Sequence, residues 1–158
     1  MAKARISEEA EPVFFVTGDR VLFDDTAERR SVSLSGSIEA ESVTVDNTLN
    51  YAFSGTGALA GHTALVKRGS GMLTIGNDNT YTGGTRISGG TASVNMLSNS
   101  TRAYGGLGGV VESADLFVIE NGATLRTTET VTQGSSMKME GEDGSCVENL
   151  KDFIIETP

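Results

Sequence analysis

The sequence predicts an all-β solenoid, with about 22 residues and three short strands in each coil. Its apolar segments hold only two or three apolar residues each, and Gly, Asn, Asp, Ser or Thr interrupts them. The segments 31–34, 42–45 and 50–53 alternate apolar and polar residues, which is the period of a half-buried strand. Strands this short need neighbours that repeat them.

Apolar residues and glycines recur at a fixed spacing along the chain. Positions that lie 22 residues apart are Val21, Val43, Leu65 and Ile87; Phe53, Ile75 and Leu97; Tyr51 and Leu73; Leu59 and Tyr81; and Gly61, Gly83 and Gly105. Each period reads as one coil, whose strands pair in parallel with those of the next coil. A single coil cannot bury its own apolar face, but a stack of coils can.

Composition agrees with a turn-rich β protein of one domain. The 158 residues include 20 Gly, 2 Pro and no Trp. The net charge of −9, without a basic patch, argues against nucleic acid and against insertion into or binding to an anionic membrane. Cys146 is the only cysteine, which excludes an intrachain disulfide and a cysteine zinc site. Neither a transmembrane segment nor a signal peptide is recognisable.

The chain divides into four parts. Residues 1–12 form a leader or N-terminal cap, 13–97 form coils, 98–112 form a Gly-rich loop, and 113–158 form further coils that end in a C-terminal cap or a truncation. Within the loop, Gly105 to Gly109 lacks the Lys-Ser/Thr of a phosphate loop and is expected to be flexible. Strands are expected at 115–119, 123–125 and 136–139. Because the ends of a solenoid are open strand edges, residues 1–20 and 146–158 are candidate caps.

Three consecutive segments carry a family resemblance. They are 65–75 (LVKRGSGMLTI), 79–85 (NTYTGGT) and 87–91 (ISGGT), and together they resemble the autotransporter-associated β-strand repeat. Met72 and Ala92 stand where the family more often has Thr and Leu. The resemblance implies a right-handed parallel β-helix in an exported bacterial protein, at or released from the cell surface after removal of a signal peptide. It implies no particular activity. Such repeats occur in passenger stalks and adhesins, and beside catalytic modules of glycan-degrading proteins.

Residues with catalytic chemistry are scarce. His62 lies in a turn without the partners of a nucleophile triad, and Cys146 has no better context. Asp24 and Asp25 are expected in a solvated turn, near Asp46 and Arg68 of the following coils. No metal site or cofactor is expected, and the chain is not expected to be an enzyme.

Two functions remain open. The first is a non-catalytic structural or presentation segment of an exported surface protein, whose partners are the other domains of that protein. The alternative is a carbohydrate-binding or accessory module of a glycan-degrading protein, with an extracellular glycan as partner. Candidate ligand contacts are Tyr104, Tyr81 and Asp78, although Tyr81 and Tyr51 also occupy repeat columns, which favours a place in the core.

Overall fold

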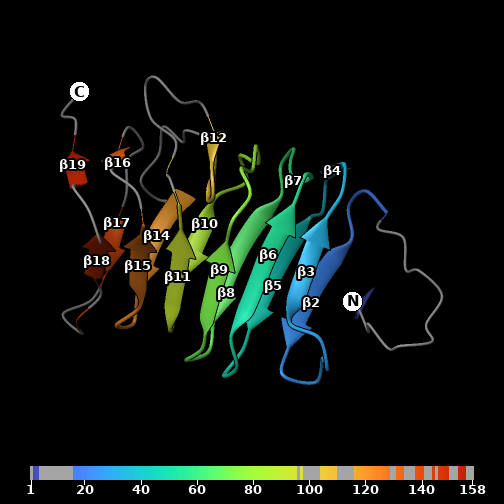
Figure 1. Cartoon of the computed structure of the whole chain (residues 1–158), viewed down its shortest axis with the longest axis horizontal. Helices are drawn as coiled ribbons and strands as arrows, with labels where there is room; N and C mark the ends of the chain where they lie inside the picture. Colours follow the sequence, from blue (N-terminus) through green and yellow to red (C-terminus); the bar gives the residue numbers. More distant parts are fainter. Residues whose placement is uncertain are drawn as a thin grey trace.

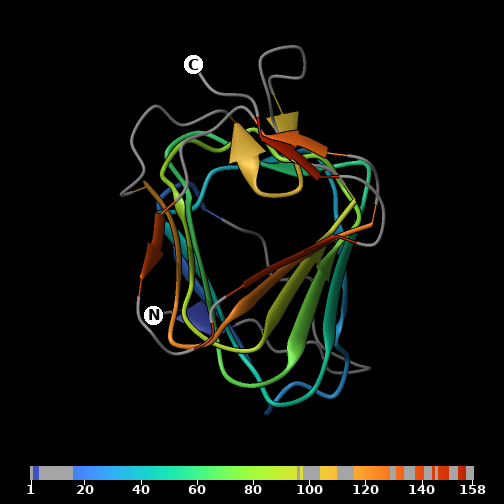
Figure 2. The same ribbon diagram turned by 90° about the vertical axis from the view of Figure 1, so that its left-hand side faces the viewer.

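The strands stack into a parallel β-solenoid (Figure 1). A computed structural model describes residues 2–3, 16–95, 97, 104–109, 116–128, 131–133, 138–140, 144, 146–149 and 153–155. The expected parallel β-helix is therefore confirmed. Viewed along the stack, two sheets and a third wall enclose the core (Figure 2).

Sheet A forms one wall from seven strands. In spatial order these are β1 (Ala2–Lys3), β2 (Arg20–Asp24), β5 (Ser42–Asp46), β8 (Ala64–Arg68), β10 (Thr85–Ile87), β14 (Phe117–Glu120) and β17 (Lys138–Glu140). All pairs are parallel, so each strand continues the ladder of the coil before it. Two columns of side chains point inward from this wall: Val21, Val43, Leu65, Thr85 and Phe117, and Phe23, Val45, Lys67, Ile87 and Ile119.

Sheet B forms the second wall from six parallel strands. From the N-terminal end these are β3 (Ser31–Leu34), β6 (Tyr51–Gly55), β9 (Met72–Ile75), β11 (Thr91–Val94), β15 (Thr124–Thr127) and β18 (Cys146–Asn149). Inward columns here are Tyr51, Leu73, Ala92 and Leu125, and Val32, Phe53, Ile75, Val94 and Thr127. The ring of Phe23 packs edge-on against those of Tyr51 and Phe53, which joins the two walls.

The third wall is less regular. Two-stranded sheets form it near the ends, from β4 (Ser37–Ile38) with β7 (Ala58–Leu59), and from β16 (Val131–Gln133) with β19 (Phe153–Ile155). Between them lies the antiparallel hairpin of β12 (Tyr104–Gly105) and β13 (Gly108–Gly109). The prediction of a flexible loop at Gly105 to Gly109 is wrong, because all five residues are buried and belong to this hairpin, in which Gly105 pairs with Gly108 and Gly109 with Tyr104.

The predicted register is correct at first and wrong further along. Val21, Val43 and Leu65 are aligned at the predicted spacing, as are Phe53 and Ile75. Beyond them, Leu65 aligns with Thr85, Ile87 with Lys67, and Ile75 with Val94 rather than Leu97. The coil that contains the Asn77–Thr82 turn is shorter, because no third strand is formed there. The next coil is longer because it holds the hairpin.

The later strands agree with the sequence. Predicted strands at 115–119 and 123–125 correspond to β14 and β15, and β17 overlaps the one at 136–139. In the C-terminal tail β18 and β19 continue the ladders of sheet B and of the third wall. Most of the predicted leader 1–12 lies outside the described residues, although Ala2–Lys3 pairs with β2.

Candidate functional site

A buried lysine ties two coils together at the corner between sheets A and B. Lys67 is the inward residue of β8 that stacks between Val45 and Ile87, and its side chain is 0% exposed. Its ammonium group donates hydrogen bonds to the carbonyl oxygens of Arg68, of Gly69 (3.0 Å) and of Gly89 (3.2 Å). Since Gly89 belongs to the following coil, one side chain caps the turns of two successive coils.

Burial and the neighbouring charges shift the pKa of this amine in opposite directions. Burial lowers the pKa of Lys67 to about 8, while the nearby carboxylates of Asp46 and Asp25 raise it. The side chain therefore still carries its charge at neutral pH. All three of its donor hydrogens have carbonyl partners, so this buried charge is fully hydrogen-bonded.

Two buried asparagines replace the missing third strand of the central coil. Asn79 is 0% exposed; its side-chain oxygen accepts the N–H of Leu59 (2.9 Å), and its amide group donates to the carbonyl of Gly106 (2.7 Å). Asn77 donates to the carbonyl of Gly57 (2.9 Å) and to the side-chain oxygen of Asn79 (3.0 Å). Side-chain amides thus make the contacts between coils that a strand would otherwise make.

The hairpin rests on this asparagine layer. The N–H of Asn79 donates to the carbonyl of Gly105, and that of Gly109 donates to the carbonyl of Tyr81, both at 2.9 Å. Leu107, at the hairpin tip, is 8% exposed and belongs to the core. A carbon added at Gly108 would lie 2.5 Å from the carbonyl oxygen of Tyr81, which requires glycine at this close approach.

Tyr81 contributes to the core rather than to a surface. Its ring is 1% exposed, and its hydroxyl shares a 2.7 Å hydrogen bond with the Thr85 hydroxyl. Burial raises the pKa of Tyr81, so the hydroxyl stays protonated. Without a conformational change the ring offers no face on which a sugar could stack.

A carboxylate organises the A–B corner of the first coils. Asp25 accepts hydrogen bonds from the N–H of Thr48, from the Thr48 hydroxyl (2.7 Å) and from the N–H of Leu49 (3.1 Å). These bonds hold the pKa of Asp25 below its usual value, and the charge of Arg30 adds to the effect. The predicted neighbourhood is also confirmed, since Asp24 aligns with Asp46, and Asp46 with Arg68.

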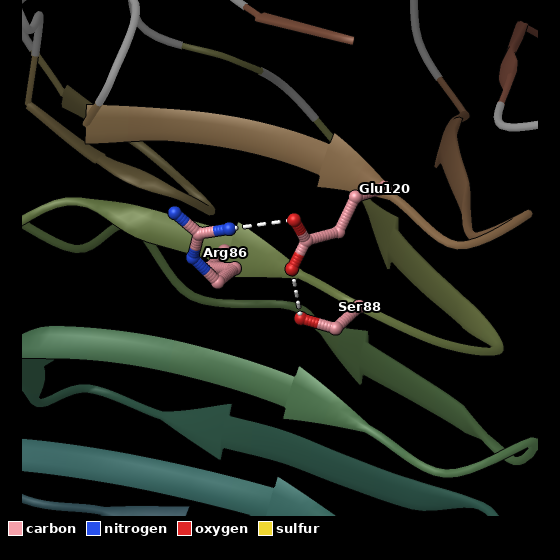
Figure 3. A network of polar contacts seen from close by, with 3 residues as sticks. All are labelled: Arg86, Ser88 and Glu120. Carbon is pink, nitrogen blue, oxygen red and sulfur yellow. Dashed lines mark hydrogen bonds and ion pairs between the residues drawn. The ribbon is translucent and has the colours of Figure 1, made fainter. Parts of the chain in front are cut away.

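An ion pair spans the coil that holds the hairpin. Glu120, at the end of β14, accepts from the Arg86 guanidinium (2.6 Å) and from the Ser88 hydroxyl (2.9 Å), as Figure 3 shows. Arg86 is half exposed, while Glu120 is largely covered. These two contacts, one to each carboxylate oxygen, fix β14 against β10 on the outer face of sheet A.

Comparison with family models gives one match. The model of the passenger-associated-transport-repeat matches residues 65–91. Residues 65–91 are therefore similar to this repeat. Comparison with curated proteins and with solved structures finds no match.

The side-chain bridges described above fall largely within this repeat. Lys67, Asn79, Tyr81 and Thr85 all lie in it, and each makes a contact with another coil or with the hairpin. The inward position of Lys67 could have been found from the sequence, because Lys67 lies two residues after the apolar Leu65 and residues two apart on a strand share a face. We infer that these buried polar residues of the repeat hold successive coils together.

The remaining candidate residues are not brought together. Asp78 is exposed between two buried asparagines. The backbone of Tyr104 forms part of β12, but its side chain lies outside the described residues. His62 is exposed in a turn, and Cys146 is exposed on β18. A glycan contact at Asp78 or Tyr104 therefore stays a prediction.

Clusters of metal-ligating side chains and membrane-spanning helices are not found in the described part of the chain. There, no cluster of three or more His, Cys, Asp or Glu side chains could hold a metal ion. Within the same residues, no helix is long and apolar enough to cross a membrane.

Adjacent residues of the repeat should differ sharply in their effect on stability. We expect Asn79→Ala to lower the free energy of unfolding by about 2 kcal/mol, because it leaves the buried N–H of Leu59 and carbonyl of Gly106 without partners. Asp78→Ala, one residue away but exposed, should change it by less than about 0.5 kcal/mol. Urea unfolding followed by circular dichroism measures both. Equal effects would contradict the bridging role of Asn79.

Proposed function

We propose that this chain is a structural segment of an exported surface protein, which spaces and presents the domains joined to it. The observation that supports this most is the continuous stack, in which inward columns run through successive coils and polar side chains bridge the turns. The repeat at 65–91 points to the passenger of an exported protein, and hence to the cell surface or the extracellular space.

Stiffness is the physical property that such a role needs. Parallel ladders fix the rise between coils at about 4.8 Å, and each coil contacts only its neighbours, so stability accumulates along the stack. The outer residues of sheet B are small or polar where they are exposed, such as Ser31, Ser33, Ser54 and Thr74. These can vary without disturbing the columns inside.

A distance measurement between two spin labels tests the rigid spacer. Cys146 is the only cysteine and is exposed, so Ser31→Cys supplies the second label at the other end of sheet B. Five strand intervals separate β3 from β18, which predicts a backbone separation of about 25 Å. We expect a single narrow distribution in pulsed electron paramagnetic resonance. A broad distribution would argue against a rigid segment.

The absence of catalysis is tested on the same purified chain. Incubation with a panel of bacterial and plant polysaccharides should release no reducing ends and no unsaturated products. Affinity electrophoresis through gels containing those polysaccharides should show unchanged mobility. Turnover would overturn the proposed function, and retardation that Asp78→Ala or Tyr104→Ala abolishes would favour the carbohydrate-binding alternative.

A further inference from the structure

The N-terminal edge of sheet B carries a charged residue where the core pattern calls for an apolar one. Along β3, Val32 and Leu34 point inward and Ser31 points outward, so Arg30 falls on the inward side by alternation. Its place is fixed by pairing, because Ser31 aligns with Ala52 and the carbonyl of Arg30 accepts the N–H of Ala52 at 2.8 Å.

Arg30 is therefore the first member of a buried column. The column continues through Tyr51, Leu73, Ala92 and Leu125, which are each at most 1% exposed. Val147 of β18 occupies the same column at the other end of the sheet. The four buried residues of this column that follow Arg30 are thus apolar or aromatic.

The guanidinium of Arg30 has at least one N–H group without a hydrogen-bond partner in the part of the chain that the structure describes. Its Nε atom is buried and has no hydrogen-bond partner among the described residues, and its charge acts on nearby Asp25. Arg30 as a whole is half-buried, so water still reaches part of it. A further coil stacked on β3 would cover the part of Arg30 that water still reaches, and it would leave the charge between two apolar layers.

Edge strands need such protection in a solenoid. The β3 strand reads Ser-Val-Ser-Leu, with no charge or proline, and its N-terminal side has no partner strand among the described residues. In a parallel ladder, Ser31 and Ser33 direct their backbone groups away from β6. Inward-pointing charges are one of the means by which natural sheets prevent edge-to-edge pairing.

We infer that Arg30 closes the N-terminal end of sheet B, so that no further solenoid coil, including one from a second copy of this chain, can stack on β3. This gives sheet B a direction: strands can be added beyond β18 but not before β3, whereas on sheet A the N-terminal side of β2 already pairs with β1. The two ends have parallel strands of the same polarity, so an unprotected β3 would accept the β18 end of another copy. Such head-to-tail contacts do not close and would grow into filaments.

Replacement of the charge by an apolar side chain of similar length tests this inference. Arg30→Met extends the apolar column to the edge, and Arg30→Leu does so with a shorter side chain. The matched control is Arg29→Met, at the adjacent and exposed position, and Arg30→Lys keeps the charge in place. The whole chain of each variant is examined by sedimentation velocity over a hundredfold range of concentration, in reducing buffer, with circular dichroism to confirm the β fold.

The expected result is a monomer for the wild type, for Arg29→Met and for Arg30→Lys. Arg30→Met or Arg30→Leu, whichever keeps the β spectrum, should self-associate at concentrations at least about tenfold lower, because the desolvation of a charge no longer opposes stacking. When Arg29→Cys is added to that variant and the reductant is removed, an intermolecular disulfide with Cys146 should form in air, since both residues occupy the same column in a head-to-tail stack. A wild type that already forms head-to-tail oligomers, or folded Arg30 variants that stay monomeric, would overturn the inference.

Discussion

Gly69→Ala should lower the free energy of unfolding by about 2 to 5 kcal/mol. Gly69 turns the chain between β8 and β9 with a φ of 68°, which costs a residue with a side chain about 1 to 2 kcal/mol. A carbon atom added there would also lie 2.3 Å from the carbonyl oxygen of Asn47 and 2.7 Å from its nitrogen. Those atoms belong to the backbone of the preceding coil and cannot rotate away, so relief requires a shift of the coil.

Gly76 provides the matched control for this prediction. It follows β9 in the same repeat, but a carbon atom added there would meet only the carbonyl oxygen of Phe53, at 3.6 Å. Gly76→Ala should therefore leave stability within about 0.5 kcal/mol of the wild type. Both variants are compared by urea unfolding at neutral pH. The account of Gly69 would be refuted by similar midpoints for the two.

The strands could be predicted from sequence because their signal is local. Alternation in 31–34, 42–45 and 50–53 identifies half-buried strands, and the 22-residue recurrence of Val21, Val43 and Leu65 gives the stacking. The register failed at Thr85, because the turn before it forms no third strand and the coil is shorter. A fixed period cannot detect a coil whose third side is made by side-chain amides.

The hairpin was missed for a related reason. A run such as Gly105 to Gly109 contains no apolar pattern beyond Leu107, so its own sequence suggests flexibility. Its order comes from groups elsewhere in the chain, namely the side chain of Asn79 and the carbonyl of Tyr81. Long-range partners of this kind cannot be read from the local sequence. The inward places of Lys67 and Arg30, by contrast, follow from alternation along β8 and β3.

The buried ammonium of Lys67 leads to the second large effect. We expect Lys67→Met to lower the free energy of unfolding by about 3 kcal/mol at pH 7, because hydrogen bonds from a charged group to three carbonyls are lost. Methionine fills much of the same volume as lysine. The loss of stability therefore reflects the missing hydrogen bonds more than the creation of a cavity. Arg68→Met, at the neighbouring exposed position, should change stability by less than about 0.5 kcal/mol.

The pH dependence of the same pair of proteins separates the charge from the packing. The pKa of Lys67 is about 8 in the folded chain, below the value of about 10.4 for an unfolded lysine. Between these values the unfolded chain binds more protons, so the contribution of Lys67 makes the free energy of unfolding rise as the pH increases from about 8 to about 10. This rise should be present in the wild type and in Arg68→Met, and it should be missing from Lys67→Met.

Subtracting the curve of Lys67→Met from that of the wild type removes the titration of the other groups. The difference should be flat below pH 7 and should grow with pH above about 8, as the buried amine loses its proton and the cost of its burial disappears. A difference that shrinks over this range would mean that the three carbonyls hold the proton more strongly than burial expels it. In that case only the charged form of Lys67 would stabilise the contact between coils, and the repeat would become less stable at alkaline pH.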